Sequence, residues 1–174
     1  MLTVVSDTHS TDSHRLHGRT LEAVRTADLV VHAGDFMRAS VLDAFEDEAT
    51  TVRGVYGNND DGEIRERLPK ARTVEYEGVR FAITHTVRGG DTALTLFGKE
   101  READAVIFGH SHRPTVNLSG PLALLNPGSH AQPRGYRAAH MELEPVADGL
   151  RGQLVTPEGE TFETFHLDSI GADE

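Results

Sequence analysis

Short polar segments with side chains that can bind metals recur along the first two thirds of this chain. They read Asp7-Thr8-His9, Gly34-Asp35, Gly57-Asn58-Asn59-Asp60, His85 and Gly109-His110-Ser111-His112. A cluster of carboxylates and imidazoles is costly to desolvate without a counter-charge, and divalent cations supply that charge. More ligands are present than one transition metal can use once room is left for water. Two metals that share a bridging carboxylate fit the ligand count, and the ligands are Asp7, His9, Asp35, Asn58, His85, His110 and His112.

The ligand types also restrict the metal. Carboxylate oxygens mixed with imidazole nitrogens suit manganese, iron, zinc, nickel or cobalt, and among these we expect manganese. The sequence contains no cysteine, which excludes zinc-thiolate sites, disulfides and thiol catalysis. Gly34, Gly57 and Gly109 each precede a candidate ligand. A glycine there lets the chain turn sharply and leaves room beside the metals.

Each polar segment follows a short apolar run that we predict to be a strand. These runs are Leu2–Ser6, Leu29–His32, Val52–Tyr56, Val79–Thr84 and Ala105–Phe108. Open α/β sheets place their ligands just beyond the carboxyl ends of the strands. Five strand ends that each carry a carboxylate, imidazole or carboxamide are therefore expected to converge on one site.

The remaining elements predict an α/β protein. Apolar spacing indicates helices over about 14–26, around Val41–Phe45, over 63–68 and over 92–102. Further strands are expected at 72–77, 115–119, 121–125, 137–144, 150–156 and 161–167. Two packed sheets with helices on their outer faces accommodate this order economically. We expect one domain over 1–168 and a frayed acidic tail over 169–174.

The charge balance is strongly acidic. Seventeen basic residues face 28 acidic ones, for a net charge of -11, and only Lys70 and Lys99 are lysines. Such a surface is typical of salt-tolerant proteins and indicates a halophilic source, although an ordinary acidic protein is the alternative. It disfavours non-specific nucleic-acid binding, which needs basic patches. The apolar start is too short for a signal peptide and nothing predicts a membrane span, so we expect a cytoplasmic protein.

Taken together, the polar segments resemble the signature of the calcineurin-like metallophosphoesterases. That signature reads Asp-x-His, Gly-Asp, Gly-Asn-His-(Asp/Glu), His and Gly-His-x-His. The opening Ser6-Asp7-Thr8-His9-Ser10 and the later Asn126-Pro127-Gly128-Ser129 are similar to the small stand-alone phosphodiesterase branch. The resemblance covers about residues 3–130, and it implies a four-layer αββα sandwich of two mixed sheets flanked by helices.

The resemblance also implies a role for each ligand. Asp7, His9 and His112 would bind the first metal, and Asp35 would bridge both. The second metal would be bound by Asn58, His85 and His110. The reaction implied is in-line attack on phosphorus by a hydroxide that bridges the two metals.

Two positions depart from the family pattern. Asn59 stands where many members have a histidine that contacts the phosphate or protonates the leaving oxygen. A carboxamide can donate a hydrogen bond but cannot give up a proton at neutral pH. The small-phosphodiesterase branch often lacks this histidine, and activity should then favour good leaving groups. Thr86 follows His85, where glycine is usual.

Several other residues are candidates for supporting roles. We expect Asp60 to orient a ligand or the turn backbone, and Arg113 to reach a phosphate. Arg134, Arg137 and His130 are weaker candidates, for which surface or structural roles are the alternative. The remaining histidines, His14, His17, His32, His140 and His166, are expected to be non-catalytic.

A phosphodiesterase acting on small phosphate esters is the function that the sequence favours. A phosphomonoesterase or nucleotidase of the same fold is one alternative, because specificity depends on loops around the cleft. A non-catalytic protein-binding scaffold on the same fold is the other, although such scaffolds tend to lose ligands that this chain retains. A homo-oligomer is compatible with the sequence.

Overall fold

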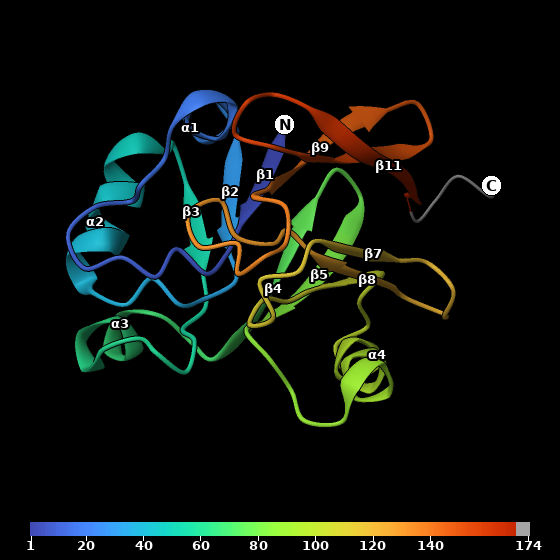
Figure 1. The fold of residues 1–174 in the computed structure, drawn as a ribbon. Helices are drawn as coiled ribbons and strands as arrows, with labels where there is room; N and C mark the ends of the chain where they lie inside the picture. The colour runs from blue at the N-terminus through green and yellow to red at the C-terminus, as the bar shows by residue number, and fades with distance from the viewer. Residues whose placement is uncertain (170–174) are drawn as a thin grey trace.

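The computed structural model describes residues 1–169, which form two β-sheets flanked by helices (Figure 1). The first sheet has the strand order β11-β10-β9-β1-β2-β3. Strands β1, β2 and β3 run parallel, and β9 joins antiparallel to β1. The bounds of its strands are Leu2–Val5 (β1), Leu29–His32 (β2), Val52–Gly54 (β3), His140–Val146 (β9), Gly149–Val155 (β10) and Thr161–Asp168 (β11).

The second sheet has the strand order β4-β5-β6-β8-β7. Its central strands β5, β6 and β8 are parallel, whereas β4 and β7 pair antiparallel at the two edges. The bounds of its strands are Ala71–Tyr76 (β4), Val79–Thr84 (β5), Ala105–Ile107 (β6), Thr115–Asn117 (β7) and Ala123–Asn126 (β8). Both sheets are thus mixed.

The main core lies between the two sheets. Alternate side chains of β1, beginning with Leu2 and Val4, point into it and meet Phe81 and Ile83 of β5. The intervening Thr3 faces the other way, and its hydroxyl donates a 2.8 Å hydrogen bond to the Ala23 carbonyl. This alternation is the period of two that a strand imposes on its side chains.

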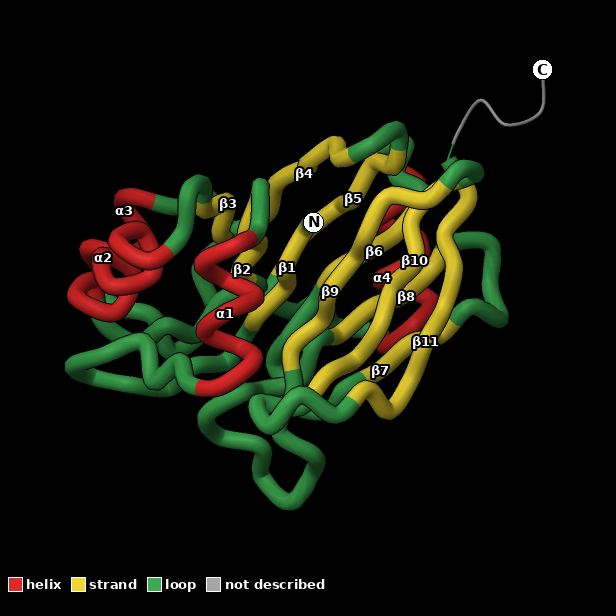
Figure 2. The backbone as a smooth tube through the Cα atoms, turned by 90° about the horizontal axis from the view of Figure 1, so that it is seen from above, coloured by secondary structure: helices red, strands yellow, loops and turns green. Residues whose placement is uncertain are grey.

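Helices cover the outer faces of both sheets. Helices α1 (Gly18–Thr26), α2 (Ala39–Glu48) and α3 (Gly62–Arg67) pack on the first sheet through a second core that includes Val24, Phe45 and Ile64. Helix α4 (Gly90–Glu100) packs on the second sheet through Leu94 and Phe97. Figure 2 shows α1, α2 and α3 on one side of the sheets and α4 on the other. The predicted four-layer αββα sandwich is confirmed.

Some element boundaries differ from the sequence-based expectation. Helix α1 begins at Gly18 and not near residue 14, because Arg15 and Gly18 both have a φ of +54°, which a continuous right-handed helix does not allow. Strand β3 ends at Gly54, because the Tyr56 N–H donates to the Pro69 carbonyl at 3.1 Å instead of continuing the sheet.

The predicted frayed tail falls mostly on 170–174, outside the described residues. Its first residue, Ser169, donates a backbone hydrogen bond of 3.1 Å to the Asp148 carbonyl. Among residues 1–169, no helix combines the length and apolarity needed to cross a membrane.

Candidate metal centre

The carboxyl ends of β1, β2, β3, β5 and β6 bring the predicted ligands to one place between the two sheets. Two groups of ligand atoms converge there, and within each group all atoms lie within 4.8 Å of one another. One group is Asp7, His9 and His112, which is the set that the family resemblance implies for the first metal. The other is Asp7, Asp35 and His85. Asp7 belongs to both groups, so its carboxylate lies at the centre of the site, and Asp35 belongs to the second group.

The backbone at the site is held in an uncommon conformation. Five of the seven predicted ligands have a positive φ, namely Asp7 (53°), His9 (47°), Asp35 (63°), His110 (75°) and His112 (60°). Left-handed non-glycine residues cost about 1–3 kcal/mol each when the chain forces them, and they concentrate at functional sites. Backbone hydrogen bonds between the loops hold the turns, from Asp7 to the Gly34 carbonyl at 2.9 Å and from His9 to the Asp35 carbonyl at 3.1 Å.

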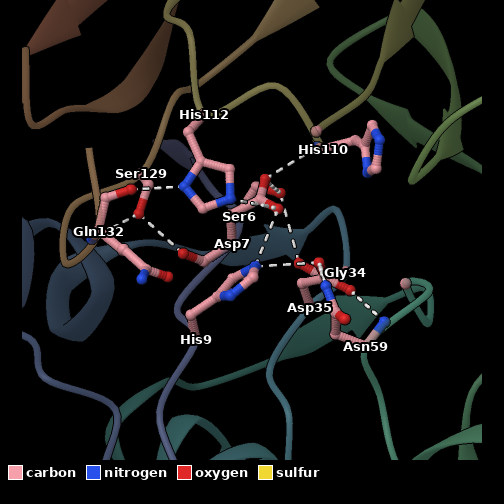
Figure 3. A network of polar contacts seen from close by, with 12 residues as sticks. Ser6, Asp7, His9, Gly34, Asp35, Asn59, His110, His112, Ser129 and Gln132 are labelled. Carbon is pink, nitrogen blue, oxygen red and sulfur yellow. Dashed lines mark hydrogen bonds and ion pairs between the residues drawn. The ribbon is translucent and has the colours of Figure 1, made fainter. Parts of the chain in front are cut away.

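The Asp7 carboxylate has one oxygen engaged and one free. Its Oδ2 accepts hydrogen bonds from the Ser6 hydroxyl at 2.7 Å and from the His110 N–H at 3.0 Å (Figure 3). Its Oδ1 is buried and accepts no hydrogen bond. A buried carboxylate oxygen without a partner is costly, and a bound cation would provide one.

Two buried histidines are fixed in the tautomer that metal binding needs. The Nδ1 of His85 donates to the Ala33 carbonyl at 2.7 Å, and the Nδ1 of His112 donates to the Gln132 carbonyl. With Nδ1 protonated, each neutral ring keeps its lone pair on Nε2. Both Nε2 atoms are buried without a hydrogen-bond partner. They lie 3.9 Å (His85) and 3.4 Å (His112) from Asp7 Oδ1.

Asp35 is surrounded by hydrogen-bond donors. The backbone N–H and the side-chain amide of Asn59 donate to its two oxygens, each at 2.9 Å. The Nε2 atoms of His9 and His85 lie 3.0 and 3.4 Å from its Oδ2. The Asn59 carboxamide therefore contacts the carboxylate that we expect to bridge the metals.

The same contacts shift the pKa values of the metal-free site. Burial raises the pKa of Asp35, but the neighbouring His85 and His9 imidazoles outweigh burial and lower it below its usual value. The Asp35 and Asp7 carboxylates raise the pKa of His9 to about 9. Burial lowers the pKa of His85, yet the two carboxylates leave it raised overall. The two aspartates thus favour the protonated form of His9 at neutral pH when no cation is bound.

Asp60 organises the loop that carries the β3 ligands. Its carboxylate accepts from the N–H groups of Gly57 (2.7 Å), Asp35 (3.0 Å) and Met37 (2.7 Å). Burial raises its pKa, and those backbone hydrogen bonds oppose the shift. Asp60 thus ties the β2 and β3 turns together through backbone hydrogen bonds, one of them from the predicted ligand Asp35.

Asn58 and His110 form the exposed edge of the site. The Nδ1 of His110 and the Oδ1 of Asn58 lie 3.1 Å apart. His110 contacts the buried cluster through its backbone N–H to Asp7, and its ring forms an edge contact with His85 at 5.3 Å between centroids. This pair borders the part of the site predicted to hold the second metal.

The turn after β8 supports the site from a sixth strand end. Ser129 donates its hydroxyl to the Asp7 carbonyl at 2.7 Å, and the Asn126 amide donates to the Gly109 carbonyl at 3.1 Å. Sequence reasoning noted this segment only as a family feature. It did not identify Gln132 or Ser6 as partners of the ligands, because a backbone carbonyl and a serine carry no distinctive pattern.

The weaker candidates lie outside the cluster. Arg113 is exposed directly after His112. Arg137 packs over the Phe162 ring at 4.6 Å. His130 is buried, its Nε2 donates to the His14 carbonyl at 2.9 Å, and burial lowers its pKa to about 4. These contacts favour a structural role for His130 over an acid role.

The fully buried His32 and His140 also have structural partners. His32 stacks on Phe36 with ring centroids 3.5 Å apart, and burial lowers its pKa well below its usual value. His140 contacts the Thr20 hydroxyl at 2.9 Å and the Glu142 carboxylate at 2.8 Å. These partners agree with the expectation that both are non-catalytic.

Buried polar atoms without a hydrogen-bond partner indicate whether the site fits metal ions. Over residues 1–169, five buried side-chain nitrogen or oxygen atoms lack a hydrogen-bond partner, and three of them are Asp7 Oδ1, His85 Nε2 and His112 Nε2. All three are lone-pair donors that face a shared space, and their other ring or carboxylate atoms are held by hydrogen bonds. Divalent cations with nitrogen and oxygen ligands fit this arrangement.

Known proteins resemble this chain in sequence. Residues 1–146 match the calcineurin-like phosphoesterase superfamily domain. The chain is 32% identical over 160 residues to a "probable metallophosphoesterase" of Methanocaldococcus jannaschii, which covers 89% of this chain and 80% of that protein. A protein of the same organism named a phosphodiesterase is 28% identical over 137 residues, covering 72% of this chain and 81% of its own.

Solved structures share the fold at lower identity. A Vps29 variant from Entamoeba histolytica has a TM-score of 0.76 at 20% identity, covering 96% of this chain and 99% of that one. A phosphoesterase from E. coli has a TM-score of 0.68, also at 20% identity, with the same coverage of both chains. At these identities the likeness shows the fold alone.

Proposed function

The chain belongs to the calcineurin-like phosphoesterase superfamily, and from that premise we propose that it is a dinuclear metal-dependent phosphodiesterase. The observation that carries the proposal is the convergence of Asp7 Oδ1, His85 Nε2 and His112 Nε2, which are buried, unpaired and free to bind a cation. The metallophosphoesterase family accounts for a hydrolase acting on phosphate esters. Beyond that family activity, we propose that the protein uses two metals and prefers diesters.

The first metal would be held by Asp7, His9 and His112, whose ligand atoms already form one group. The second would be held by His85 together with Asn58 and His110 at the exposed edge, with Asp35 shared between the two. Bound divalent ions of this kind supply an activated water and neutralise charge on the phosphoryl oxygens. Manganese is the ion we propose, with nickel, iron, zinc and cobalt as substitutes.

The protein's own groups prepare the site for this chemistry. Carbonyl acceptors hold His85 and His112 in the tautomer that leaves Nε2 free, and Asn59 holds Asp35 through two hydrogen bonds. Such preorganisation spares the reaction the reorientation of these groups at the moment of attack.

The diester preference rests on the resemblance to the small-phosphodiesterase branch, which often lacks a histidine at the position of Asn59. The Asn59 side-chain amide donates to Asp35 at 2.9 Å, and an amide cannot deliver a proton to a leaving oxygen at neutral pH. Substrates whose leaving group needs no proton should therefore react best. The similarity to a relative named a phosphodiesterase supports the same reading.

The test is hydrolysis of bis-p-nitrophenyl phosphate and p-nitrophenyl phosphate by chelator-stripped protein, with and without added manganese. Wild-type protein and an Asp35→Asn variant should be compared at low and high salt. Manganese-dependent cleavage of the diester, abolished by Asp35→Asn, is the expected result. Preference for the monoester would identify a phosphomonoesterase or nucleotidase instead. Retained activity only at high salt would support the halophilic origin.

A non-catalytic scaffold is the alternative function, favoured by the fold likeness to Vps29, a protein whose name refers to vacuolar protein sorting. It is supported by folded protein that turns over neither ester with any of the five metals. The buried unpaired ligand atoms fit bound cations, which the proposed hydrolysis requires.

A further inference from the structure

A cavity opens directly beside the exposed edge of the metal centre. It has a volume of about 540 Å³, and Asn58 and His85 belong both to its lining and to the predicted ligands. Ligand pockets typically measure about 300–1,000 Å³. A substrate whose scissile phosphate lies at the metal centre would therefore have room in this cavity for the part that is not cleaved.

The cavity gathers positive charge on an acidic protein. Arg65, Lys70 and Arg88 line it, and no aspartate or glutamate among residues 1–169 does. The chain has only two lysines and a net charge of -11, so three cations without a carboxylate in one cavity depart from its overall composition. The positive potential of this cavity would attract an anion rather than a neutral group.

The three cations that line the cavity have no acidic partners in the part of the chain that the structure describes. Within residues 1–169, none of Arg65, Lys70 and Arg88 forms an ion pair, whereas seven arginines elsewhere do, namely Arg19, Arg25, Arg67, Arg80, Arg101, Arg137 and Arg151. Their charges are therefore available to a ligand.

Arg65 is held in place without losing its charge. Its Nε and one terminal nitrogen donate to the carbonyls of Asp60 and Asn58, each at 3.1 Å. Its guanidinium carbon lies 5.0 Å from the centroid of the Tyr56 ring. Carbonyl and aromatic partners fix the guanidinium without neutralising it, which suits a preorganised anion contact.

We propose that this cavity is a substrate subsite for a second phosphate group, so that the preferred substrate is a small phosphate ester carrying another phosphate besides the scissile one. The inference rests on the proposed function and names its substrate class. A terminal phosphate carries about -1.5 to -2 charge at neutral pH and three acceptor oxygens, which match several cations better than a single carboxylate would. The acidic surface disfavours a nucleic-acid chain, which would need many more phosphate contacts.

The test compares two p-nitrophenyl esters of thymidine 5′-phosphate, one with a free 3′-hydroxyl and one with a 3′-phosphate. The scissile bond and leaving group are identical, so the ratio of their KM values reports the second phosphate. With manganese-loaded wild-type protein, the 3′-phosphate should lower KM by about tenfold, the contribution of one or two charge-assisted contacts.

The double variant Lys70→Ser/Arg88→Ser should reduce that ratio to about one. Its matched control is Lys99→Ser/Arg151→Ser, which removes the same charge from α4 and β10 and should keep the wild-type ratio. Thermal melting and bound manganese should be measured for both variants, so that a loss of fold or metal is recognised.

A second readout does not depend on turnover. Calorimetry with chelator-stripped protein should show tighter binding of thymidine 3′,5′-bisphosphate than of thymidine 5′-monophosphate, and Lys70→Ser/Arg88→Ser should remove the difference. Failure to hydrolyse either ester would refute the proposed function, and the binding data would then decide the subsite alone. Equal KM values for the two esters, or equal affinities for the two nucleotides, would overturn the subsite.

Discussion

Gly57 lies against the carboxylate that we expect to bridge the metals, so its substitution by alanine should disable the site. A Cβ built on Gly57 would lie 2.1 Å from Asp35 Oδ1 and 2.6 Å from the Asp35 backbone nitrogen. The φ of Gly57 is not in the left-handed region, so the effect of Gly57→Ala comes from this contact alone. The contacting atoms belong to a buried residue, 1% exposed, that cannot swing aside into solvent.

The size of the effect follows from that geometry. Non-bonded carbon and oxygen atoms approach to about 3.3 Å, so the Asp35 carboxylate must move by about 1 Å. Functional side chains need to be held within about 0.5 Å, and a 1 Å misplacement can cost about a hundredfold in rate. Overpacking of this kind also lowers the free energy of unfolding by about 1–3 kcal/mol, or about 2–12 °C in Tm for a domain of this size.

The assay is the manganese content of chelator-stripped and reconstituted Gly57→Ala protein, measured beside its Tm and its turnover of bis-p-nitrophenyl phosphate. Gly120→Ala is the matched control, because a Cβ on Gly120 meets nothing within 4 Å, and it should behave as wild type. We expect Gly57→Ala to remain folded, to retain less metal and to lose at least about a hundredfold in rate. Wild-type metal content and rate in folded Gly57→Ala would refute the placement of Asp35 at the centre of the site.

Three further predictions follow from other contacts. The pKa of His9 is about 9 when no metal is bound, so manganese binding at pH 7.5 should release about one proton. Calorimetry in buffers of different ionisation enthalpy measures the number of protons released, and His9→Asn should lower that number. Burial raises the pKa of Glu142, but His140 and Arg19 lower it to about 2 from its usual 4.5, so the unfolding free energy should fall by about 3 kcal/mol as pH drops from about 5 to 2. In denaturant titrations at several pH values, Glu142→Gln should weaken this fall in unfolding free energy below about pH 5. An unchanged pH dependence would exclude the contacts of Glu142 with His140 and Arg19 as its source. Asn59→His should leave the manganese content unchanged, because the backbone N–H at this position still donates to Asp35; loss of metal would show that the Asn59 carboxamide is needed to hold Asp35.

The positions of the candidate ligands at the ends of strands can be predicted from the sequence. Val79–Thr84 was predicted with the bounds that the structure has. The prediction worked because buried parallel strands read as apolar, β-branched runs, and the residue after each run is a polar group with few other reasons to follow a core strand. The start of α1 could not be predicted, because the Arg19 N–H in its first turn donates to the Pro157 carbonyl, far away in sequence.

Partners that depend on tertiary contact were also out of reach. The carbonyl of Gln132 that holds His112 belongs to a loop with no pattern of its own. Arg65 and Lys70 lie near the start of β4, and Arg88 lies between β5 and α4, so only the fold brings Arg88 to the same cavity. Nothing in the spacing of these cations links them, so the cavity beside the metal centre became visible only in the folded chain.

The most direct test of the central claim is an anomalous difference map from a crystal of the manganese-loaded protein. We expect two peaks about 3.5–4 Å apart, with Asp35 between them. One peak should lie among Asp7, His9 and His112, and the other among Asn58, His85 and His110. A single peak, or peaks away from these residues, would contradict the dinuclear site.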